Sequence, residues 1–405
     1  MPTRSRLIIT VGIAATLLAL GATSCSNSDE SSDTTASSTS TSLVVGTVPD
    51  DEIRIGLEGP LTGDQADVGT GMLDGAQMAA DELNAAGGID GKTVTIVQID
   101  DQADPDTGVA AATVTIADGL SAVVGPYNSG VGEQTLPLYI DAGLVPLRLT
   151  SADATEGMGF TLQPMTSQIA PVATTAITEW ADADSVALIY DETQDYTADA
   201  KDAMSSALDA AGVTITADVA IDPGADSYTD AVTEATANDP DLVYVITYYP
   251  EAGLIAQAML ESAPDSQCLA DYGAYDTGYV EAAGQAAAQN CPVVGVPAPD
   301  DFPDSAELVA SYADTFGGAP GTWAPYAYDS VMLLAAAIVE AGGVEQAPLT
   351  SALAATSDWS GWTGSVAFDA STGNREPAPV VVLSTRDDGT LHLDESWSTA
   401  TGFEF

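Results

Sequence analysis

The sequence predicts an α/β protein of two lobes, each a parallel β-sheet with helices on both faces. Short runs of β-branched residues alternate with alanine-rich segments of helical period, and this repetition is typical of parallel sheets covered by helices. The chain has 405 residues, which is more than one hydrophobic core usually organises. Because there are also too many strand–helix units for one sheet, two lobes are expected, with a change of local character near Gln163-Pro164-Met165.

Short β-branched runs are predicted to form the strands of these sheets. They are Glu52–Leu57, Thr93–Asp100, Ala122–Gly125, Val145–Leu149, Ser185–Tyr190, Val213–Ile221, Asp241–Thr247 and Pro292–Val296.

Helices are predicted between these strands. After the first strand, Met72, Ala76, Ala79 and Leu83 recur at the spacing of one buried helical face, and Ala86-Gly87-Gly88 ends that helix. Further helices are predicted around Asp106–Ala117, Gly130–Ala142, Gln168–Trp180, Thr197–Ala211, Tyr228–Ala237, Ala252–Ala263, Asp304–Phe316 and Tyr326–Ala341.

The composition excludes several classes of function. The chain has 60 Asp and Glu against 8 Lys and Arg, a formal net charge of −52, which excludes a nucleic-acid reader. Hydrophobic residues make up 45%, so this is no disordered acidic tail. With one His and three Cys, and without GxSxG, HExxH or Walker A strings, we expect no metal, no cofactor and no enzymatic activity.

The N-terminus has the layout of a secretory signal peptide. Arg4 and Arg6 precede an apolar run, Leu7–Gly21, and small residues then lead to Cys25. A Cys in this place resembles a bacterial lipobox, so we expect residues 1–24 to be a lipoprotein signal peptide and Cys25 to carry the lipid. Ordinary secretion with an incidental Cys25 is the alternative. Residues 25–51, rich in Ser, Thr and Asp, are predicted to be a flexible tether that holds the folded part at the outer face of the cell membrane.

The other two cysteines, Cys268 and Cys291, lie in the predicted folded part. In an oxidising compartment such a pair is most simply a disulfide, and two free buried thiols are the alternative.

Loops at the carboxyl ends of the first strands are where a doubly wound sheet places its ligand site. They span 58–63, 125–132 and 150–157 and are rich in Gly, Ser, Thr and Asn, residues that expose backbone N–H groups and hydroxyls. Such an array can hold a carboxylate without a cationic side chain. For any single residue, an ordinary turn or helix-capping role is the alternative.

Several separated motifs occur in order along residues 52–393. They are Glu58-Gly59-Pro60-Leu61-Thr62-Gly63, Asp74-Gly75-Ala76, Leu83 to Lys92, Asp100 to Pro105, Val124-Gly125-Pro126 and Tyr248-Tyr249-Pro250-Glu251. In this combination the chain resembles the leucine/isoleucine/valine-type periplasmic binding proteins.

The resemblance implies a type I periplasmic binding fold, in which two lobes joined by three crossovers close on a small ligand. Carried onto this chain, lobe I is 52–165 with 298–370, and lobe II is 166–297 with 371–405. Proteins of this family deliver solute, often an amino acid, to a membrane ABC permease. A ligand-sensing receptor of the same fold is the alternative, and an extracytoplasmic hydrolase is a third possibility.

The resemblance also implies site residues. Ser129 matches the Ser that holds the ligand α-carboxylate, and Tyr196 and Tyr248 match aromatic contacts from lobe II, although either Tyr could equally fill the core. The register of the loop after the fourth strand is ambiguous. One register favours Ser151, next to Ala152, and another favours Ala154 and Thr155; we place Ser151 first.

The family's acid for the ligand α-ammonium falls on Tyr272, with Asp271 beside it. If Asp271 substitutes, the ligand is an amino acid. If Tyr272 stands there, the ligand lacks an ammonium or presents it elsewhere, for example to Asp276.

Two further residues are weighed outside the resemblance. Arg148 follows a strand beside the predicted site and could pair with a ligand carboxylate or form a structural salt bridge. His392 lies between two Leu residues near the C-terminus and is most simply a surface strand residue.

Overall fold

The structure is a computed structural model that describes residues 43–403. The predicted signal peptide, Cys25 and the first part of the predicted tether lie outside the described residues.

The first sheet is entirely parallel, with strand order β2-β1-β3-β4-β5. Its strands are β1 (Glu52–Gly59), β2 (Thr93–Asp100), β3 (Ala122–Val124), β4 (Pro146–Arg148) and β5 (Phe160–Thr161). The second sheet has the order β14-β13-β10-β9-β8-β6-β7. Its strands are β6 (Ser185–Asp191), β7 (Thr214–Ile221), β8 (Leu242–Ile246), β9 (Gln267–Ala270), β10 (Val293–Gly295), β13 (Val381–Thr385) and β14 (Leu391–Leu393). A separate hairpin joins β11 (Trp359–Gly361) to β12 (Gly364–Val366).

The expectation of two parallel sheets needs one correction. Strand β13 runs antiparallel to both β10 and β14, so the second sheet is mixed. The short turn at 386–390 accounts for the antiparallel pairing of β13 with β14, because only antiparallel neighbours can be joined by so few residues.

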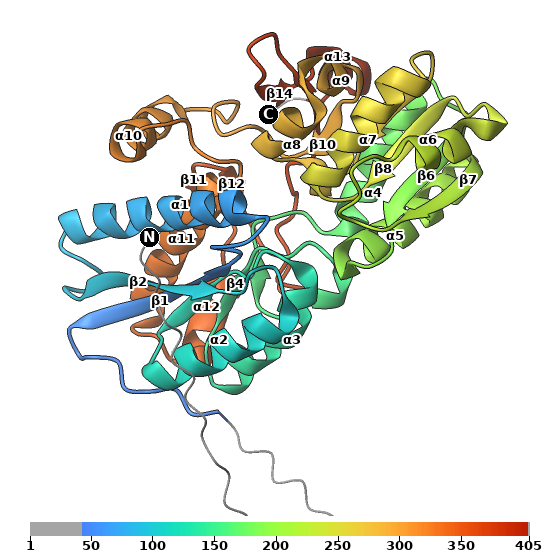
Figure 1. The fold of residues 1–405 in the computed structure, drawn as a ribbon. Coiled ribbons are helices and arrows are strands. Elements are labelled where there is room, and N and C mark those ends of the chain that lie inside the picture. The colour runs from blue at the N-terminus through green and yellow to red at the C-terminus, as the bar shows by residue number, and fades with distance from the viewer. Residues whose placement is uncertain (1–42, 404–405) are drawn as a thin grey trace, which may run out of the picture. The chain divides into compact units, whose positions relative to one another are not determined.

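Helices cover both faces of the first sheet (Figure 1). One layer contains α1 (Ala66–Ala85), α11 (Ala324–Ala341) and α12 (Gln346–Ala354), and the other contains α2 (Pro105–Asp118) and α3 (Ser129–Asp141); α10 (Ala306–Phe316) lies against α1 on the side away from the sheet. The predicted face of α1 is confirmed, since Met72, Ala76 and Ala79 are fully buried and Leu83 is partly buried. A Cβ on Gly75 would lie 2.1 Å from the Ala324 carbonyl oxygen, so glycine lets α1 lie directly against α11.

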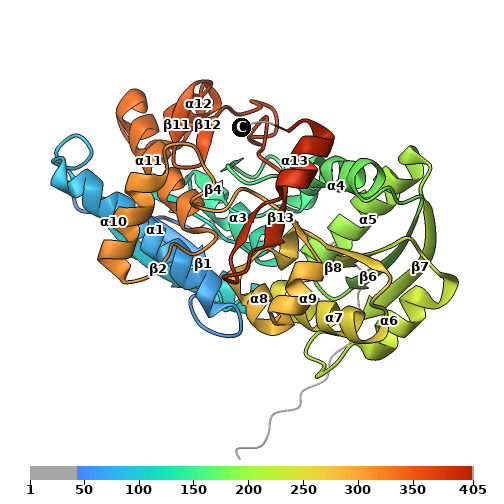
Figure 2. The ribbon, with the colours of Figure 1, turned by 90° about the horizontal axis from the view of Figure 1, so that it is seen from above.

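The second sheet is covered in the same way, as Figure 2 shows. One layer holds α4 (Thr166–Thr175), which continues as a π-turn to Trp180, α5 (Asp195–Ala211) and α13 (Glu395–Thr401). The other holds α6 (Thr229–Ala235), α7 (Tyr249–Ser262), α8 (Thr277–Ala283) and α9 (Gln285–Asn290). The predicted disulfide between Cys268 and Cys291 is present and joins the start of β9 to the segment before β10.

The chain passes between the two sheets three times, after β5, after β10 and before β13. Ahead of the last passage, Asn374 forms a bridge with Thr161 at the edge of the first sheet, and Arg375 pairs with Phe368. Among residues 43–403, no single helix is long and apolar enough to cross a membrane; α11 and α12 reach that length and apolarity only as a pair bent by 114°.

Candidate functional site

The loops at the carboxyl ends of strands from both sheets enclose a small cavity. The cavity is large enough for about one water molecule. The residues that line it are Tyr127, Ser129, Leu149, Ser151, Gln163, Tyr196, Tyr248, Tyr272 and Gly273. The first sheet supplies the loops after β3, β4 and β5, and the second supplies those after β6, β8 and β9.

Ser129 is the first residue of α3, so its hydroxyl lies at the N-terminus of that helix. Its Oγ accepts hydrogen bonds from the backbone N–H of Ser151 at 3.3 Å and of Ala152 at 3.1 Å. Both N–H groups lie in the loop after β4, so the two hydrogen bonds hold this loop against the start of α3, which follows β3. The result is a cluster of small polar groups on the first-lobe side of the cavity.

Gln163 carries the second polar cluster. Its Oε1 accepts the hydroxyls of Ser151 and Tyr272, both at 3.2 Å, and thereby joins the two lobes through one amide. Its Nε2 is buried and has no hydrogen-bond partner. Because an amide nitrogen is a donor only, the cavity wall offers an unused donor to an oxygen atom of a ligand.

Five aromatic rings form a closed ring of contacts at the cavity. The centroid of Tyr127 lies 6.5 Å from that of Tyr248, which lies 5.9 Å from that of Tyr196. Tyr196 is followed by Tyr272 at 6.4 Å, Tyr272 by Trp323 at 5.5 Å, and Trp323 by Tyr127 again at 5.5 Å. We call these five side chains the aromatic ring. Four of them line the cavity, and Trp323, before α11, completes the circle.

Asp271 lies behind this ring, fully buried. Its carboxylate accepts the hydroxyl of Tyr196 at 2.6 Å and that of Tyr244 at 2.5 Å. Burial raises the pKa of Asp271, while these donors oppose the rise. The carboxylate therefore has its partners within the protein.

The structure brings only some of the ligand-binding residues predicted from the sequence to the cavity. Five of them line the cavity: Ser129, Ser151, Tyr196, Tyr248 and Tyr272. Three others do not, and each has a partner elsewhere. Ala152 directs its N–H to Ser129, the Thr155 hydroxyl bonds to Thr150, and Asp271 bonds to Tyr196 and Tyr244.

Four lining residues were missed from the sequence: Tyr127, Leu149, Gln163 and Gly273. Tyr127 directly follows the Gly125-Pro126 motif, and Gln163 belongs to the segment where the local character changes, so each had a weak signal. Gly273 is needed for packing, because a Cβ there would lie 3.0 Å from Tyr196 Cε1 and 3.1 Å from the Thr247 carbonyl oxygen.

The two lobes also touch outside the cavity. The Tyr249 hydroxyl donates to the backbone oxygen of Asp64 at 3.0 Å, and the backbone N–H of Asp153 donates to the Asp199 carboxylate at 2.9 Å. Each bond joins a loop of the first lobe to a helix of the second. The lobes are therefore closed over the cavity.

Arg148 does neither of the things expected of it. Its guanidinium is fully buried and donates to the backbone oxygen of Thr155 at 2.9 Å and to Asn374 Oδ1 at 2.6 Å. Neither partner is an acid, and Arg148 is not among the residues that line the cavity. Burial lowers the pKa of Arg148 to about 10. The residue joins the loop after β4 to the segment that precedes the last crossover.

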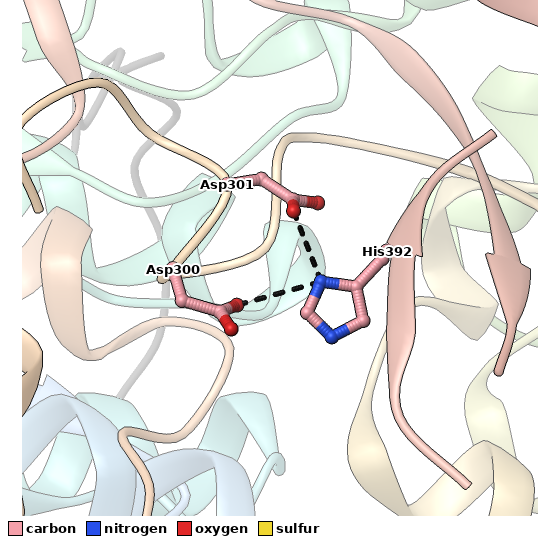
Figure 3. Close-up of side chains that lie close together, drawn as sticks. All are labelled: Asp300, Asp301 and His392. Carbon is pink, nitrogen blue, oxygen red and sulfur yellow. Dashed lines mark hydrogen bonds and ion pairs between the residues drawn. The ribbon is translucent and has the colours of Figure 1, made fainter. Parts of the chain in front are cut away.

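His392 is a buried residue of β14, so the expectation of a surface position was wrong. Its Nδ1 lies 2.9 Å from Asp301 Oδ1 and 3.6 Å from Asp300 Oδ1 (Figure 3). The other oxygen of Asp301 accepts the backbone N–H of Leu393 at 2.7 Å. These side chains could in principle hold a cation, with ligand atoms within 4.8 Å of one another. Their hydrogen bonds already explain the cluster as a link between β14 and the loop after β10.

The comparisons with known proteins agree with this geometry. The sequence model of the family described as periplasmic binding protein matches residues 52–390. The Leu/Ile/Val-binding protein homolog 2 of Brucella abortus is 28% identical over 351 residues, which cover 84% of this chain and 92% of the relative.

Solved structures have the same fold. The leucine-binding protein of Thermotoga maritima superposes with a TM-score of 0.78 at 20% identity, covering 84% of this chain and 97% of that one. The branched-chain amino acid transporter substrate-binding protein of Streptococcus pneumoniae, solved with isoleucine, gives 0.75 at 27% identity, with the same coverage of 84% and 97%.

Proposed function

Because the chain belongs to the periplasmic binding protein family, we propose that it is the extracytoplasmic solute-binding subunit of an ABC importer. It captures an amino acid or a similar small polar solute in the cavity between the lobes. The relative from Streptococcus pneumoniae is described as a transporter substrate-binding protein in complex with isoleucine, which supports a ligand of this size.

One observation carries this proposal. Polar groups from the first lobe, at Ser129 and Ser151, and tyrosines from the second, at Tyr196, Tyr248 and Tyr272, meet around the same cavity. A ligand that touches both sets stabilises the closed arrangement, because it bonds to both lobes only when they are together. The closed cavity is large enough for only about one water molecule, so a solute can enter only when the lobes move apart.

The crossovers supply the hinge for this motion. We propose the division predicted from the sequence, 52–165 with 298–370 in the first lobe and 166–297 with the C-terminal segment in the second, with one adjustment. Asn374 and Arg375 bond to the first lobe, through Thr161 and Thr363, so the last crossover is placed after Arg375 rather than after residue 370.

The proposal extends to the location. A lipid on Cys25 would hold the protein at the outer face of the cell membrane, where a permease takes up the released solute. The apolar run before Cys25 and the polar segment after it support this assignment. Labelling with a radioactive fatty acid, which Cys25→Ser should abolish, tests it separately from ligand binding.

A thermal-shift screen tests the binding function. Amino acids, amides, short carboxylates and their N-methylated forms are added to the full-length protein, and at least one should raise the melting temperature. A ligand at a hundredfold excess over its Kd stabilises by about 2.7 kcal/mol. If no compound in any class stabilises the protein, the proposed function is wrong.

The double variant Ser151→Ala with Tyr196→Ala should weaken binding of the active compound by more than tenfold. The matched control is Ser206→Ala with Tyr190→Ala, which removes the same groups from residues that do not line the cavity. Equal loss in both variants would exclude this cavity as the binding site.

A further inference from the structure

We propose that the ligand is a betaine, a carboxylate that carries a quaternary ammonium group, with the ammonium inside the aromatic ring and the carboxylate on Gln163. This inference rests on the proposed function and adds the class of solute to it. Four features of the cavity support it: the acceptors that are already occupied, the charges around the cavity, the arrangement of the five rings and the unpaired donor on Gln163.

A primary ammonium group has three N–H donors, and each needs an acceptor once it leaves water. None of the nine lining residues carries a carboxylate. The adjacent carboxylate, Asp271, already accepts two hydroxyls, and Gln163 Oε1 already accepts two hydroxyls. The hydroxyls of Tyr and Ser that remain in the lining are weaker acceptors than a carboxylate. A quaternary ammonium has no N–H group, so the lack of acceptors costs it nothing.

The charges around the cavity favour a positive group. No Lys or Arg lines it, whereas carboxylates lie behind several of its tyrosines. Beyond the effect of burial, Asp271 raises the pKa of Tyr196, and Tyr248 and then Asp276 raise that of Tyr127. The pKa of Tyr248 is lowered by a hydrogen bond with Asn128 and raised by Asp191 and Asp195. The same field would repel a ligand with a net negative charge, such as a simple aromatic acid. A betaine has no net charge.

The spacing of the five ring centroids suits such a group, provided that the lobes close less tightly around it than they do in this structure, where the cavity holds about one water molecule. A point in the middle of five centroids spaced as these are lies about 5 Å from each, within the range of about 6 Å over which cations are attracted to aromatic faces. The hydroxyl of Tyr196 donates to Asp271, which increases the electron density of that phenol ring. Quaternary ammonium ions are weakly hydrated, and aromatic cages are a general means of binding them.

The carboxylate of the ligand has a donor ready for it. Gln163 Nε2 is buried without a partner, on a side chain that is fully buried and lines the cavity. An unpaired buried donor is costly, and a ligand oxygen would satisfy it. Gln163 lies next to Tyr272 and Ser151, so one ligand can reach both the amide and the ring.

Calorimetry with matched ligands tests the inference on the full-length protein. Glycine, alanine and valine are each compared with their N,N,N-trimethyl forms, and we expect trimethylation to increase affinity at least tenfold for one pair or more. Glycine betaine is then compared with 3,3-dimethylbutanoate, in which carbon replaces the charged nitrogen at nearly the same shape. The charged member should bind at least tenfold more tightly.

The outcomes separate this inference from the proposed function. Tightest binding of a primary amino acid, or of an aromatic carboxylate, would overturn the betaine assignment and leave the solute-binding function intact. Equal binding of glycine betaine and its carbon analogue would also overturn it, because shape alone would then explain recognition. No binding of any compound would contradict the proposed function itself.

A variant of Tyr272 gives a second test. Tyr272→Glu places a carboxylate in the cavity wall, so the preference for the trimethylated over the parent amino acid should fall at least tenfold. Tyr272→Phe keeps the ring but frees one acceptor position on Gln163 Oε1, so it should lower that preference less than Tyr272→Glu does. If Tyr272→Glu does not fold, Tyr127→Leu, which removes a ring from the other lobe, should reduce the preference for glycine betaine over its carbon analogue. An unchanged preference in a folded Glu or Leu variant would overturn the inference.

Discussion

The hydroxyl of Tyr196 donates to the carboxylate of Asp271 across 2.6 Å, and both side chains are buried. This bond holds the acid behind the cavity wall and the phenol ring in the wall. The residue of this sequence pair that lines the cavity is consequently Tyr272, and its neighbour Asp271 lies behind the wall. The chemistry available to a ligand is determined by which of these two adjacent residues faces it.

Tyr244 is the second hydroxyl on Asp271 and does not line the cavity, so it separates stability from binding. Tyr244→Phe should lower the free energy of unfolding by about 1–3 kcal/mol, because a buried carboxylate loses a donor. Urea unfolding at pH 7 measures this loss, and calorimetry should show ligand affinity unchanged within threefold. An unchanged unfolding midpoint would contradict the role assigned to this bond.

Glu58 and Asp101 predict a pH dependence of stability. Both are buried carboxyls; burial raises the pKa of Glu58 well above its usual range and that of Asp101 to about 7. Because the folded state holds these protons more tightly than the unfolded state, the two groups contribute less stability as pH rises from about 4 through 7 and above.

Removing the charge of Glu58 should therefore increase the free energy of unfolding most at high pH. We expect the change in the free energy of unfolding caused by Glu58→Gln to be more favourable at pH 9 than at pH 5 by about 1.4 kcal/mol or more, which is the equivalent of one pKa unit. Urea unfolding of the wild type, Glu58→Gln and the exposed control Glu261→Gln at both pH values measures it. The same difference in the control would show that overall charge, not Glu58, is responsible.

The Cys268–Cys291 disulfide closes a segment with a sequence separation of 23. Replacing both residues by Ser should lower the free energy of unfolding by about 3 kcal/mol, since the unfolded chain regains the entropy of an open loop. Adding a reductant should shift the wild type towards the variant and leave the variant unchanged. A reductant effect of equal size in the variant would exclude the disulfide as the cause.

Arg148 is expected to resist conservative replacement. Arg148→Lys should destabilise the protein by about 2 kcal/mol or more, because one ammonium cannot reach both Thr155 and Asn374 as the planar guanidinium does. Thermal unfolding measures the loss, and Arg54→Lys, at a less buried guanidinium, is the control. Equal stability of Arg148→Lys and the wild type would mean that the two hydrogen bonds contribute little.

Much of the fold could be predicted because most of its strands are runs of β-branched residues. Thr93–Asp100 is predicted with the bounds of β2, and the other predicted strands overlap β1, β3, β4, β6, β7, β8 and β10. Strand β9, Gln267–Ala270, was missed because it contains no β-branched residue. The C-terminal strands β13 and β14 were missed as well, and they are the ones that make the second sheet mixed.

The site was harder to predict because a shift of one residue reverses the direction of a side chain. Asp271 and Tyr272 lie where β9 ends and a short 3₁₀ helix, Tyr272–Ala274, begins, and their side chains point in different directions, so a sequence alignment alone cannot say which one faces the cavity. Thr155 shows a second limit. A hydroxyl suited to a ligand bonds instead to Thr150, and only the folded loop reveals that partner.

Two of the hydrogen bonds that join the lobes outside the cavity, from Tyr249 to Asp64 and from Asp153 to Asp199, involve no ligand. They favour closure whether solute is present or not, so they increase the fraction of closed protein before a solute binds. Weakening either bond lowers the apparent affinity for every solute by one common factor and leaves the order of preference unchanged. The cavity thus sets which solutes are chosen, and these distant contacts set the concentration at which they are detected.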